Sequence, residues 1–546
     1  MGRQMDLTCC RWKAFLVVLV TWAAVYLPGL GKPEFKGEEG RRVLPAVEML
    51  KTGNWVVPRI GGQDYYNKPP GINWLVAASF VLTGEQSELS ARLPSAVFVL
   101  IFVALLLWMP ASPKTASRGG PSPWLSVEAR FISAIIFLTN IAVIEKGRLI
   151  EIEAVYISLT GIATLLWLNS WSANSSKWLL WLAPSIVLGF GMLVKGPFIL
   201  IFFYSVVVSV LWYSRRPKDL LAIQHLVGLS VVLLMALGWF YLASQQTSGS
   251  KMTGQMSGQL LTRIIRKPDV IYWGRNVARS FTNFLPWLVF IPMLWDKKLT
   301  SQIEQAYWTL FRGCQLGLVT GFVVINLMPG MESRYSMPVI PLASVLLGWM
   351  LSLRKELCSS EQLWKNILLA CFLASCLTAA AGLIFVTRTL IAFVVLALAI
   401  CATAIVFWKR NAIKYPPLLS LVTAVFVVVA MLQYSCFGLE LVTANEKRRP
   451  AAMNVNRIVP AGQTLYILKP GNQLNPVIFY IQPPISYVLD ANDVNDNMHY
   501  LLLKNADLKA LKAEGKISKR PGAVLYEFTD DIQGQYRLVQ LDYPRD

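Results

Sequence analysis

Long apolar runs separated by short polar segments occupy the first 436 residues of the chain. Each run is long enough, or nearly so, to cross a hydrocarbon core about 30 Å thick at 1.5 Å per residue. The pattern predicts an all-α polytopic membrane protein with about thirteen transmembrane helices. The predicted segments are 14–30, 92–110, 131–148, 152–170, 178–194, 197–213, 225–243, 282–296, 311–329, 336–353, 366–386, 390–408 and 416–436.

The pattern changes in the last part of the chain. Five strand-like runs, TLYIL, ISYVLD, HYLLLK, AVLYEF and YRLVQL, alternate there with the helical stretches NPVIFYI and NADLKALKAEG. This mixture is typical of a small α/β domain. We therefore expect a transmembrane module over residues 1–436 and an α/β domain outside the cytoplasm over residues 437–546.

Charged residues in the connecting loops predict the orientation. Alternate loops, for example 111–130, 214–224 and 354–365, are short and basic, which is typical of loops on the cytoplasmic side. This places the N-terminus in the cytoplasm. An odd number of spans then puts the C-terminal domain on the opposite, outer side, together with two long loops over 31–91 and 244–281.

Composition narrows the class of protein. With 55% hydrophobic and 15% charged residues, the chain is neither disordered nor an ordinary soluble domain. The net charge of +20 would fit nucleic-acid binding, but most of the excess lies in the predicted cytoplasmic loops and no soluble segment is strongly basic. We expect no nucleic-acid partner. The excess of positive charge in the predicted outer loops is informative, because the positive-inside rule predicts few Lys and Arg there.

Acidic residues gather in two places on the predicted outer face. KPEFKGEEGRR, after the first span, contains Glu38 and Glu39 beside Arg41, and precedes the amphipathic stretch VLPAVEML, predicted to lie along the membrane surface. EKGRLIEIE, between spans three and four, contains Glu151 and Glu153. Charges at a bilayer boundary are costly unless paired or functional. Two interpretations stay open, headgroup-level salt bridges and a site for a polar substrate.

Basic residues and tyrosines also gather on this predicted face. Tyr65 and Lys68 belong to QDYYNKPPG, whose proline pair prevents an early helix. Lys and Arg with tyrosine hydroxyls are suited to binding phosphate. The other members are Lys195 in LVKGPF, Arg263 and Arg266 in LLTRIIRKP, and Arg334 with Tyr335 in ESRYSMP.

The order of these motifs resembles that of the GT-C glycosyltransferases. An acidic pair follows the first span, and a surface helix, a tyrosine before KPP, an acidic residue between spans three and four, KGP and RYxxP come after it. The chain is most similar to the bacterial lipid A aminoarabinose transferases and the protein O-mannosyltransferases, over about residues 10–350. Each motif alone is weak, whereas the ordered set is fairly specific.

The resemblance implies roles for individual residues. The acidic pair of the family matches Glu38 and Glu39, and its second acidic residue matches Glu153, with Glu151 as the rival; these are the implied catalytic residues. Glu38 stands where the family usually has Asp, so we expect a changed donor or acceptor pocket. The implied ligands of the donor and its phosphate are Arg41, Tyr65, Lys68, Lys195, Arg263 or Arg266, Arg334 and Tyr335.

The implied function is transfer of a monosaccharide from a polyprenyl-phosphate carrier to a lipid A-like lipid, a glycan or a protein. The reaction would take place on the periplasmic face of the bacterial inner membrane. Cations would stabilise the leaving phosphate. Glu38 or Glu153 would act as general base on a hydroxyl acceptor, whereas a phosphate acceptor needs none. No cofactor is firmly implied, and a divalent metal is possible but not favoured.

A transporter or flippase of an anionic lipid or solute is the alternative. Such a protein would carry polar residues and helix breaks near the middle of the membrane. The central parts of the predicted spans, for example SVVLLMALGW, are nearly free of charge. The ionisable residues gather at one predicted face, which favours an interfacial active site.

Overall fold

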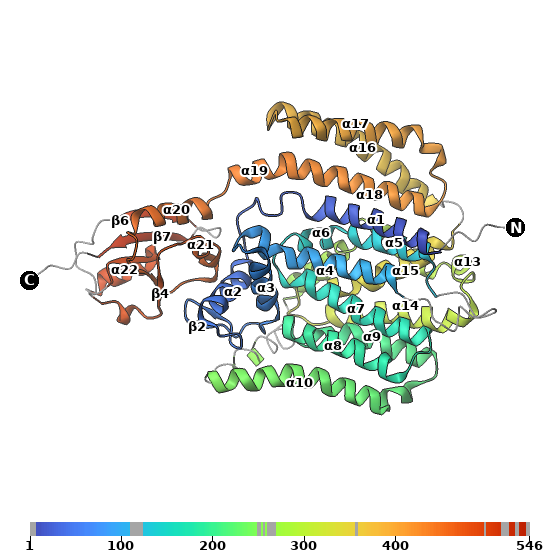
Figure 1. The fold of residues 1–546 in the computed structure, drawn as a ribbon, viewed down its shortest axis with the longest axis horizontal. Helices are drawn as coiled ribbons and strands as arrows, with labels where there is room; N and C mark the ends of the chain where they lie inside the picture. The colour runs from blue at the N-terminus through green and yellow to red at the C-terminus, as the bar shows by residue number, and fades with distance from the viewer. Residues whose placement is uncertain are drawn as a thin grey trace, which may run out of the picture. The chain divides into compact units, whose positions relative to one another are not determined.

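A computed structural model gives the fold. It describes residues 7–109, 124–247, 253–254, 257–258, 269–354, 359–495, 498–514, 524–529 and 534–541. The chain divides into two compact units (Figure 1). Unit 1 comprises Met1–Leu30, Asn67–Gly71 and Arg92–Glu440, and unit 2 comprises Gly31–Tyr66, Ile72–Ala91 and Leu441–Asp546.

Unit 1 is helical, and each of the predicted apolar segments contains a helix. The α-helices are α1 (Leu7–Tyr26), α4 (Glu88–Trp108), α5 (Val127–Leu138), α6 (Ile141–Gly147), α7 (Ile152–Ser172), α8 (Lys177–Lys195), α9 (Phe198–Tyr213), α10 (Ile223–Gln246), α12 (Val270–Thr282), α13 (Lys297–Thr300), α14 (Trp308–Asn326), α15 (Ile340–Ser352), α16 (Ser359–Phe385), α17 (Leu390–Trp408) and α18 (Pro416–Gln433). The first residues of α4 and most of α19 (Leu439–Ala444) belong to unit 2. Two 3-10 helices, Trp287–Trp295 and Ser333–Val339, complete the predicted segments. The prediction of a polytopic helical protein is confirmed.

The structure gives a range for the number of membrane spans. Within the described ranges, nine helices are long and apolar enough to cross a membrane, or up to eleven if each of two bent pairs counts as one span. The pair α5 and α6 is bent by 64°, and α12 with Trp287–Trp295 by 88°. At the first bend Asn140 is extended, and its side chain accepts a hydrogen bond from the Val143 N–H and donates to the Asn283 carbonyl. The total of thirteen spans stays a prediction.

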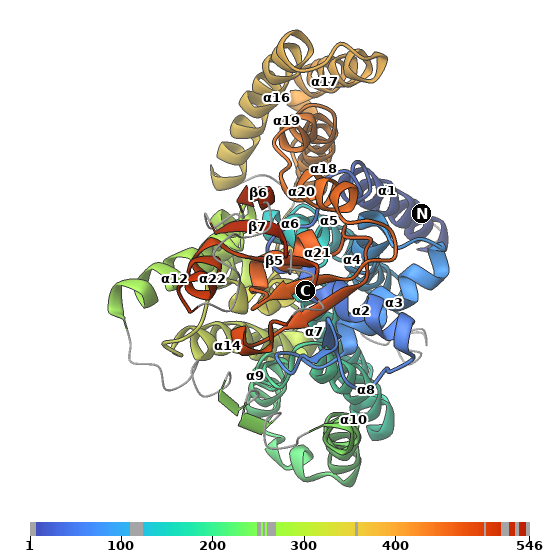
Figure 2. The same ribbon diagram turned by 90° about the vertical axis from the view of Figure 1, so that its left-hand side faces the viewer.

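Small residues allow the helices of unit 1 to pack closely. A Cβ on Gly313 or Gly317 of α14 would lie 2.5 or 2.6 Å from the Cα of Val210 or Val206 on α9. The two helices therefore lie in direct contact along this face (Figures 1 and 2). A larger residue at either glycine would push α14 away from α9.

The segment 31–91 contains more regular structure than the loop that we predict from the sequence. The amphipathic stretch forms α2 (Gly40–Thr52), which ends at Gly53 in the left-handed conformation. A short hairpin follows, β1 (Arg59–Ile60) and β2 (Gln63–Asp64), and then α3 (Gly71–Thr83). Helix α3 is apolar but has only 13 residues, fewer than the roughly 20 that a span requires. Length is thus the reason that it is absent from the predicted elements.

The C-terminal region contains the predicted α/β structure. Within the described residues, five strands form one sheet in the order β4-β3-β5-β7-β6. Strands β4, β3 and β5 are parallel, and β5, β7 and β6 are antiparallel. The elements are α20 (Arg448–Ile458), β3 (Leu465–Leu468), α21 (Asn475–Ile478), β4 (Ile485–Val488), β5 (Tyr500–Lys504), α22 (Asn505–Ala513), β6 (Val524–Thr529) and β7 (Gln535–Gln540), several of which are labelled in Figure 2.

All five strand-like runs are strands, so the α/β prediction is confirmed. The hydrophobic residues of the sheet form two clusters, one that includes Leu465 and Leu538 and another that includes Leu501 and Leu508. The compact unit around this sheet also contains 31–66 and 72–91. The domain boundary at residue 436 stays a prediction.

Within unit 2, Glu34 connects the segment that follows α1 to helix α20. Its carboxylate accepts hydrogen bonds from the N–H groups of Arg448 at 2.9 Å and Arg449 at 2.8 Å, and pairs with the Arg448 guanidinium at 2.7 Å. An anionic group at a helix N-terminus satisfies N–H groups that have no partner inside the helix. A second connection lies beside it, where Glu88 accepts from Arg449 at 2.6 Å and from the Tyr480 hydroxyl at 2.8 Å.

Removing the carboxylate of Glu34 should loosen unit 2. We expect Glu34→Ala to lower the free energy of unfolding by roughly 2–4 kcal/mol, because it leaves a partly buried arginine and several N–H groups without their acceptor. Thermal unfolding and limited proteolysis of the C-terminal region would measure the change. Glu85→Ala is the matched control, because Glu85 is an exposed residue of the same unit. Equal stability of the two variants would contradict the role of Glu34.

Candidate functional site

The ends of three helical elements bring charged residues together in unit 1. Glu153 lies in the first turn of α7, Lys195 is the last residue of α8, and Arg334 belongs to the helix Ser333–Val339. The carboxylate of Glu153 lies 3.1 Å from Lys195 Nζ and 3.8 Å from Arg334 Nε. Glu153 and Lys195 are only 5% and 7% exposed. A buried carboxylate here holds two cations that the sequence places far apart.

Two tyrosine rings enclose the ammonium group of Lys195. Its Nζ lies 4.5 Å from the ring centroid of Tyr335 and 5.3 Å from that of Tyr156. Such contacts stabilise a cation that is removed from water. Tyr335 is predicted from the sequence, whereas Tyr156 is not. The signal available for Tyr156 is its position three residues after Glu153, which puts both on one face of α7.

The turn between α8 and α9 depends on a glycine. Gly196 has φ +105° and ψ −166°, a conformation that residues with a Cβ rarely adopt. Its carbonyl accepts a hydrogen bond from the Tyr156 hydroxyl at 3.1 Å, and Pro197 follows as the first residue outside α9. The KGP motif therefore ends one helix, starts the next and leaves Lys195 pointing into the cluster.

Glu151 and Glu153 belong to different ion pairs. Glu151 lies 2.9 Å from the ammonium of Lys146, which also lies 2.8 Å from Glu145. Arg148 donates to the carbonyls at the end of α1, among them Tyr26 and Pro28, so it satisfies the orphan carbonyls of that helix. Glu151 therefore fits the salt-bridge interpretation of the acidic residues that the sequence left open. Glu153, in contrast, belongs to the cluster around Lys195.

Lys68 belongs to the short segment Asn67–Gly71 of unit 1. Pro69, Pro70 and Gly71 are buried, and a Cβ on Gly71 would lie 2.7 Å from the carbonyl oxygen of Leu193. The KPPG segment is thus packed against the last turn of α8. This is the turn that ends at Lys195.

A second charged cluster lies in unit 2. Glu38 pairs with Arg42 at 2.6 Å and with Arg41 at 3.3 Å. The guanidinium of Arg42 also donates to the Tyr65 hydroxyl at 3.2 Å, so it joins Glu38 and Tyr65, two residues that the sequence predicts as site residues. Glu39 is fully buried and accepts a hydrogen bond from the Lys36 N–H at 3.0 Å. The two acidic residues of the pair thus have different surroundings.

Two of the predicted phosphate ligands, Arg263 and Arg266, lie outside the described residues. Within the part of the chain that the structure describes, no three His, Cys, Asp or Glu residues lie close enough together to hold a metal ion.

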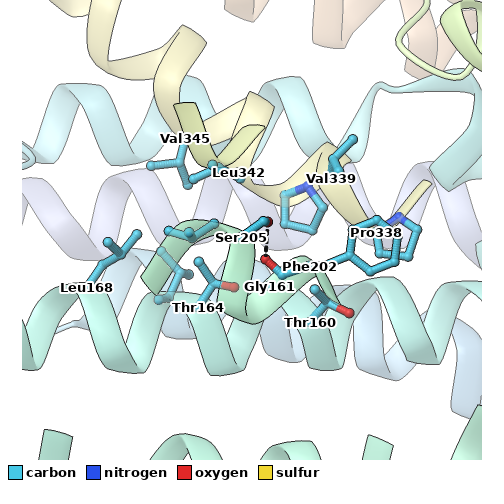
Figure 3. A pocket seen from close by; sticks show the side chains of 14 residues that line it. Thr160, Gly161, Thr164, Leu168, Phe202, Ser205, Pro338, Val339, Leu342 and Val345 are labelled. Carbon is cyan, nitrogen blue, oxygen red and sulfur yellow. Dashed lines mark hydrogen bonds between the residues drawn. The ribbon is translucent and has the colours of Figure 1, made fainter. Parts of the chain in front are cut away.

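Helix α7 is tightly packed beyond the cluster. A small cavity of about 20 Å³ lies beside Thr160, Gly161 and Thr164, opposite Phe202 and Ser205 of α9 (Figure 3). The Ser205 hydroxyl donates to the Phe202 carbonyl at 2.8 Å. This space is enough for roughly one water molecule and too small for a substrate.

The Glu153–Lys195 pair should contribute to stability only while both partners are present. Glu153→Gln or Lys195→Met alone is expected to lower the unfolding free energy by roughly 3–5 kcal/mol, because each leaves a buried charge without its partner. The double variant should lose much less than the sum. Detergent-induced unfolding followed by tryptophan fluorescence would measure all three.

Lys177→Met is the control for this cycle. Lys177 pairs with Asp219 at 3.3 Å, but its side chain is 50% exposed, and surface pairs contribute only about 0–1 kcal/mol. Additive losses in the Glu153/Lys195 cycle would show that the buried pair is not energetically coupled.

Comparisons with known proteins bear on the same segments. The family model described as dolichyl-phosphate-mannose-protein mannosyltransferase matches residues 67–241, a range that contains Lys68, Glu153 and Lys195. A protein of Pseudomonas fluorescens named undecaprenyl phosphate-alpha-4-amino-4-deoxy-L-arabinose arabinosyl transferase 2 is 24% identical over 404 residues, which cover 69% of this chain and 66% of that protein. An uncharacterized protein of Aquifex aeolicus is 25% identical over 295 residues, which cover 52% of this chain and 55% of that protein.

The alignments with these two relatives cover between 55% and 66% of their length. A solved structure, ArnT from Cupriavidus metallidurans bound to undecaprenyl phosphate, matches with a TM-score of 0.70 at 17% identity, over 97% of both chains. The likeness at this identity concerns the fold. This multi-pass membrane protein therefore has the fold of ArnT, as the GT-C resemblance implies, and is similar over residues 67–241 to the mannosyltransferase family.

Proposed function

We propose that the protein is a membrane glycosyltransferase that moves a monosaccharide from a polyprenyl-phosphate carrier to an acceptor of the cell envelope. The acceptor classes are a lipid A-like lipid, a glycan or a protein. The observation that carries the proposal is the cluster in which buried Glu153, Lys195 and Tyr335 meet the partly exposed Arg334. It is supported by the arabinosyl transferase name of several relatives and by the fold shared with ArnT.

Cations are the main requirement of this reaction. The acceptor oxygen attacks the anomeric carbon, the bond from that carbon to the phosphate oxygen breaks, and polyprenyl phosphate leaves with the electron pair. Lys195 and Arg334 would stabilise the charge on this phosphate. Lys68, in the segment packed against the end of α8, would be a further ligand. Arg263 and Arg266 remain candidates from the predicted outer loop.

The ion pairs favour an acceptor that needs no general base. Glu153 pairs with Lys195 and Arg334, and Glu38 pairs with Arg41 and Arg42. A carboxylate engaged with cations is suited to orienting them, and less suited to removing a proton from a hydroxyl group. A phosphate acceptor is already ionised near neutral pH and requires no such step. We therefore favour a phosphate on the acceptor, with the carboxylates in orienting roles.

The charge distribution supports a location for the reaction. We propose that the protein lies in the bacterial inner membrane with the N-terminus in the cytoplasm and the C-terminal domain in the periplasm. The basic loops between alternate spans support this orientation. Comparing cells with and without the active protein would test the function, because the polyprenyl-phosphate sugar should accumulate only where the protein is inactive. Mass spectrometry of lipid-linked sugars and envelope glycans would detect it.

Lys68→Ala should reduce transfer at least about 10²-fold, because a ligand of the leaving phosphate is lost. The rate would be measured with purified protein, an undecaprenyl-phosphate-linked sugar and isolated envelope lipids. Lys36→Ala is the matched control, since Lys36 is an exposed lysine of the segment 31–91. Transfer by Lys68→Ala at the rate of this control would refute the assignment of Lys68.

Glu38→Asp should retain more activity than Glu38→Gln. The aspartate keeps the negative charge that pairs with Arg41 and Arg42, whereas the glutamine is expected to lose about 10²-fold in rate. The same transfer assay would compare them. An equal loss in both variants would mean that the length of the side chain matters and its charge does not.

A further inference from the structure

Unit 2 contains a pocket that is separate from the residues discussed so far. Its volume is about 480 Å³, within the range of roughly 300–1,000 Å³ that is typical of ligand sites. One wall is helix α2, another is the turn between β1 and β2, and a third runs from the end of α21 to β4. None of the predicted catalytic or phosphate-binding residues lines it.

One face of α2 is turned toward this pocket. Leu44, Val47, Glu48, Lys51 and Thr52 line it, and their spacing of three and four residues places them on a single helical stripe. The buried residues of α2 that pack into unit 2, such as Val43 and Ala46, lie at other positions. The helix therefore presents a mixed polar and apolar stripe to an open space.

Two polar side chains lie close together in the wall. The Glu48 carboxylate accepts a hydrogen bond from the Gly62 N–H at 2.9 Å, and burial raises its pKa. The Tyr487 hydroxyl is buried and has no hydrogen-bond partner among the described residues. Burial, followed by the charge of Glu48, raises the pKa of Tyr487, so this hydroxyl stays protonated and can donate.

The glycine turn positions Tyr487. A Cβ on Gly61 would overlap the Tyr487 ring, so the ring packs directly on the backbone of the turn. Phe479, Pro483 and Pro484, which also line the pocket, add one aromatic and two proline rings to its wall. The pocket thus combines an acceptor, a donor without a partner and apolar ring surfaces.

We infer that this pocket binds a saccharide ring. Sugar hydroxyl groups both donate and accept hydrogen bonds, so one hydroxyl can donate to Glu48 while another accepts from Tyr487. The side-chain amides of Gln86 and Gln482 at the wall offer both kinds of partner as well. The C–H face of a sugar ring can lie against the aromatic and proline surfaces.

The charges in the wall argue against an anionic ligand. Glu48 and Lys51 are one turn apart on α2 and have opposite sign, so a phosphate near Lys51 would also meet the carboxylate. A neutral ligand avoids this repulsion. The inference rests on the proposed function in one respect. If the protein is a glycosyltransferase, the bound sugar is a glycan part of its acceptor.

Saturation-transfer NMR on the full-length protein would test the inference. The protein would be kept in lauryldimethylamine oxide, because a glucoside or maltoside detergent would compete. The probes are the neutral disaccharides N,N′-diacetylchitobiose and maltose, with a serine- and glycine-rich heptapeptide and inorganic phosphate for comparison. We expect at least one disaccharide to bind, and to bind more tightly than the peptide or phosphate.

Tyr487→Phe and Glu48→Gln should each weaken disaccharide binding about tenfold, since each removes one hydrogen bond or its charge. Tyr536→Phe is the matched control, because it removes a buried hydroxyl from β7 of the same sheet. Val47→Trp, which fills the pocket, should abolish binding. Thermal unfolding would verify that each variant is folded.

Three results would overturn the inference: no disaccharide binding to the wild-type protein, unchanged binding in the folded Tyr487→Phe and Val47→Trp variants, or preferred binding of the peptide or phosphate. The proposed transferase function is separable from it. Transfer without disaccharide binding would leave the function standing and remove the saccharide site. If the protein binds a disaccharide through Tyr487 but transfers no sugar, the saccharide site would stand and the proposed function would fall.

Discussion

The buried ion pair of Glu153 and Lys195 is the constraint on which the candidate site depends. Removing two charges from water costs several kcal/mol each, and the cost is offset only where the partners meet in good geometry. Here it requires the start of α7 and the end of α8 to converge within 3.1 Å. The Gly196 turn, the Tyr156 hydroxyl bond and the packing of Gly71 on α8 all serve this convergence.

Charged side chains also bond to the ends of helices elsewhere in the molecule. Arg148 donates to the last carbonyls of α1 in unit 1, and Glu34 accepts from the first N–H groups of α20 in unit 2. In each case a charged side chain satisfies backbone groups that a helix end leaves unpaired. Several of the ionisable residues that gather in the sequence are therefore structural. The pattern of charges alone does not separate these residues from Glu153.

Hydrophobic periodicity predicts most of the fold because burial in lipid or in a sheet leaves a long and regular pattern. The helices of unit 1 and the five strands follow it. Features set by a few atoms are different. The bend at Asn140 depends on one side-chain cap, and α3 is too short to be recognised as a span. Likewise, Tyr156 is recognised as part of the site only from the structure, in which Lys195 lies over its ring.

The arrangement of the cluster also explains how it could act on a phosphate without a metal. Folding has already buried Lys195 and partly buried Arg334, whose side chain is 22% exposed, and holds both against Glu153. An arriving phosphate would therefore not have to strip these cations of a full hydration shell. Two cations share one buried carboxylate, and Glu332, the other partner of Arg334, is 40% exposed. A phosphate can therefore join the cluster by taking over a position that solvent-exposed Glu332 now holds. Charge that develops on the phosphate as the sugar leaves would then meet donors that are already oriented, which is the condition under which electrostatic stabilisation is largest.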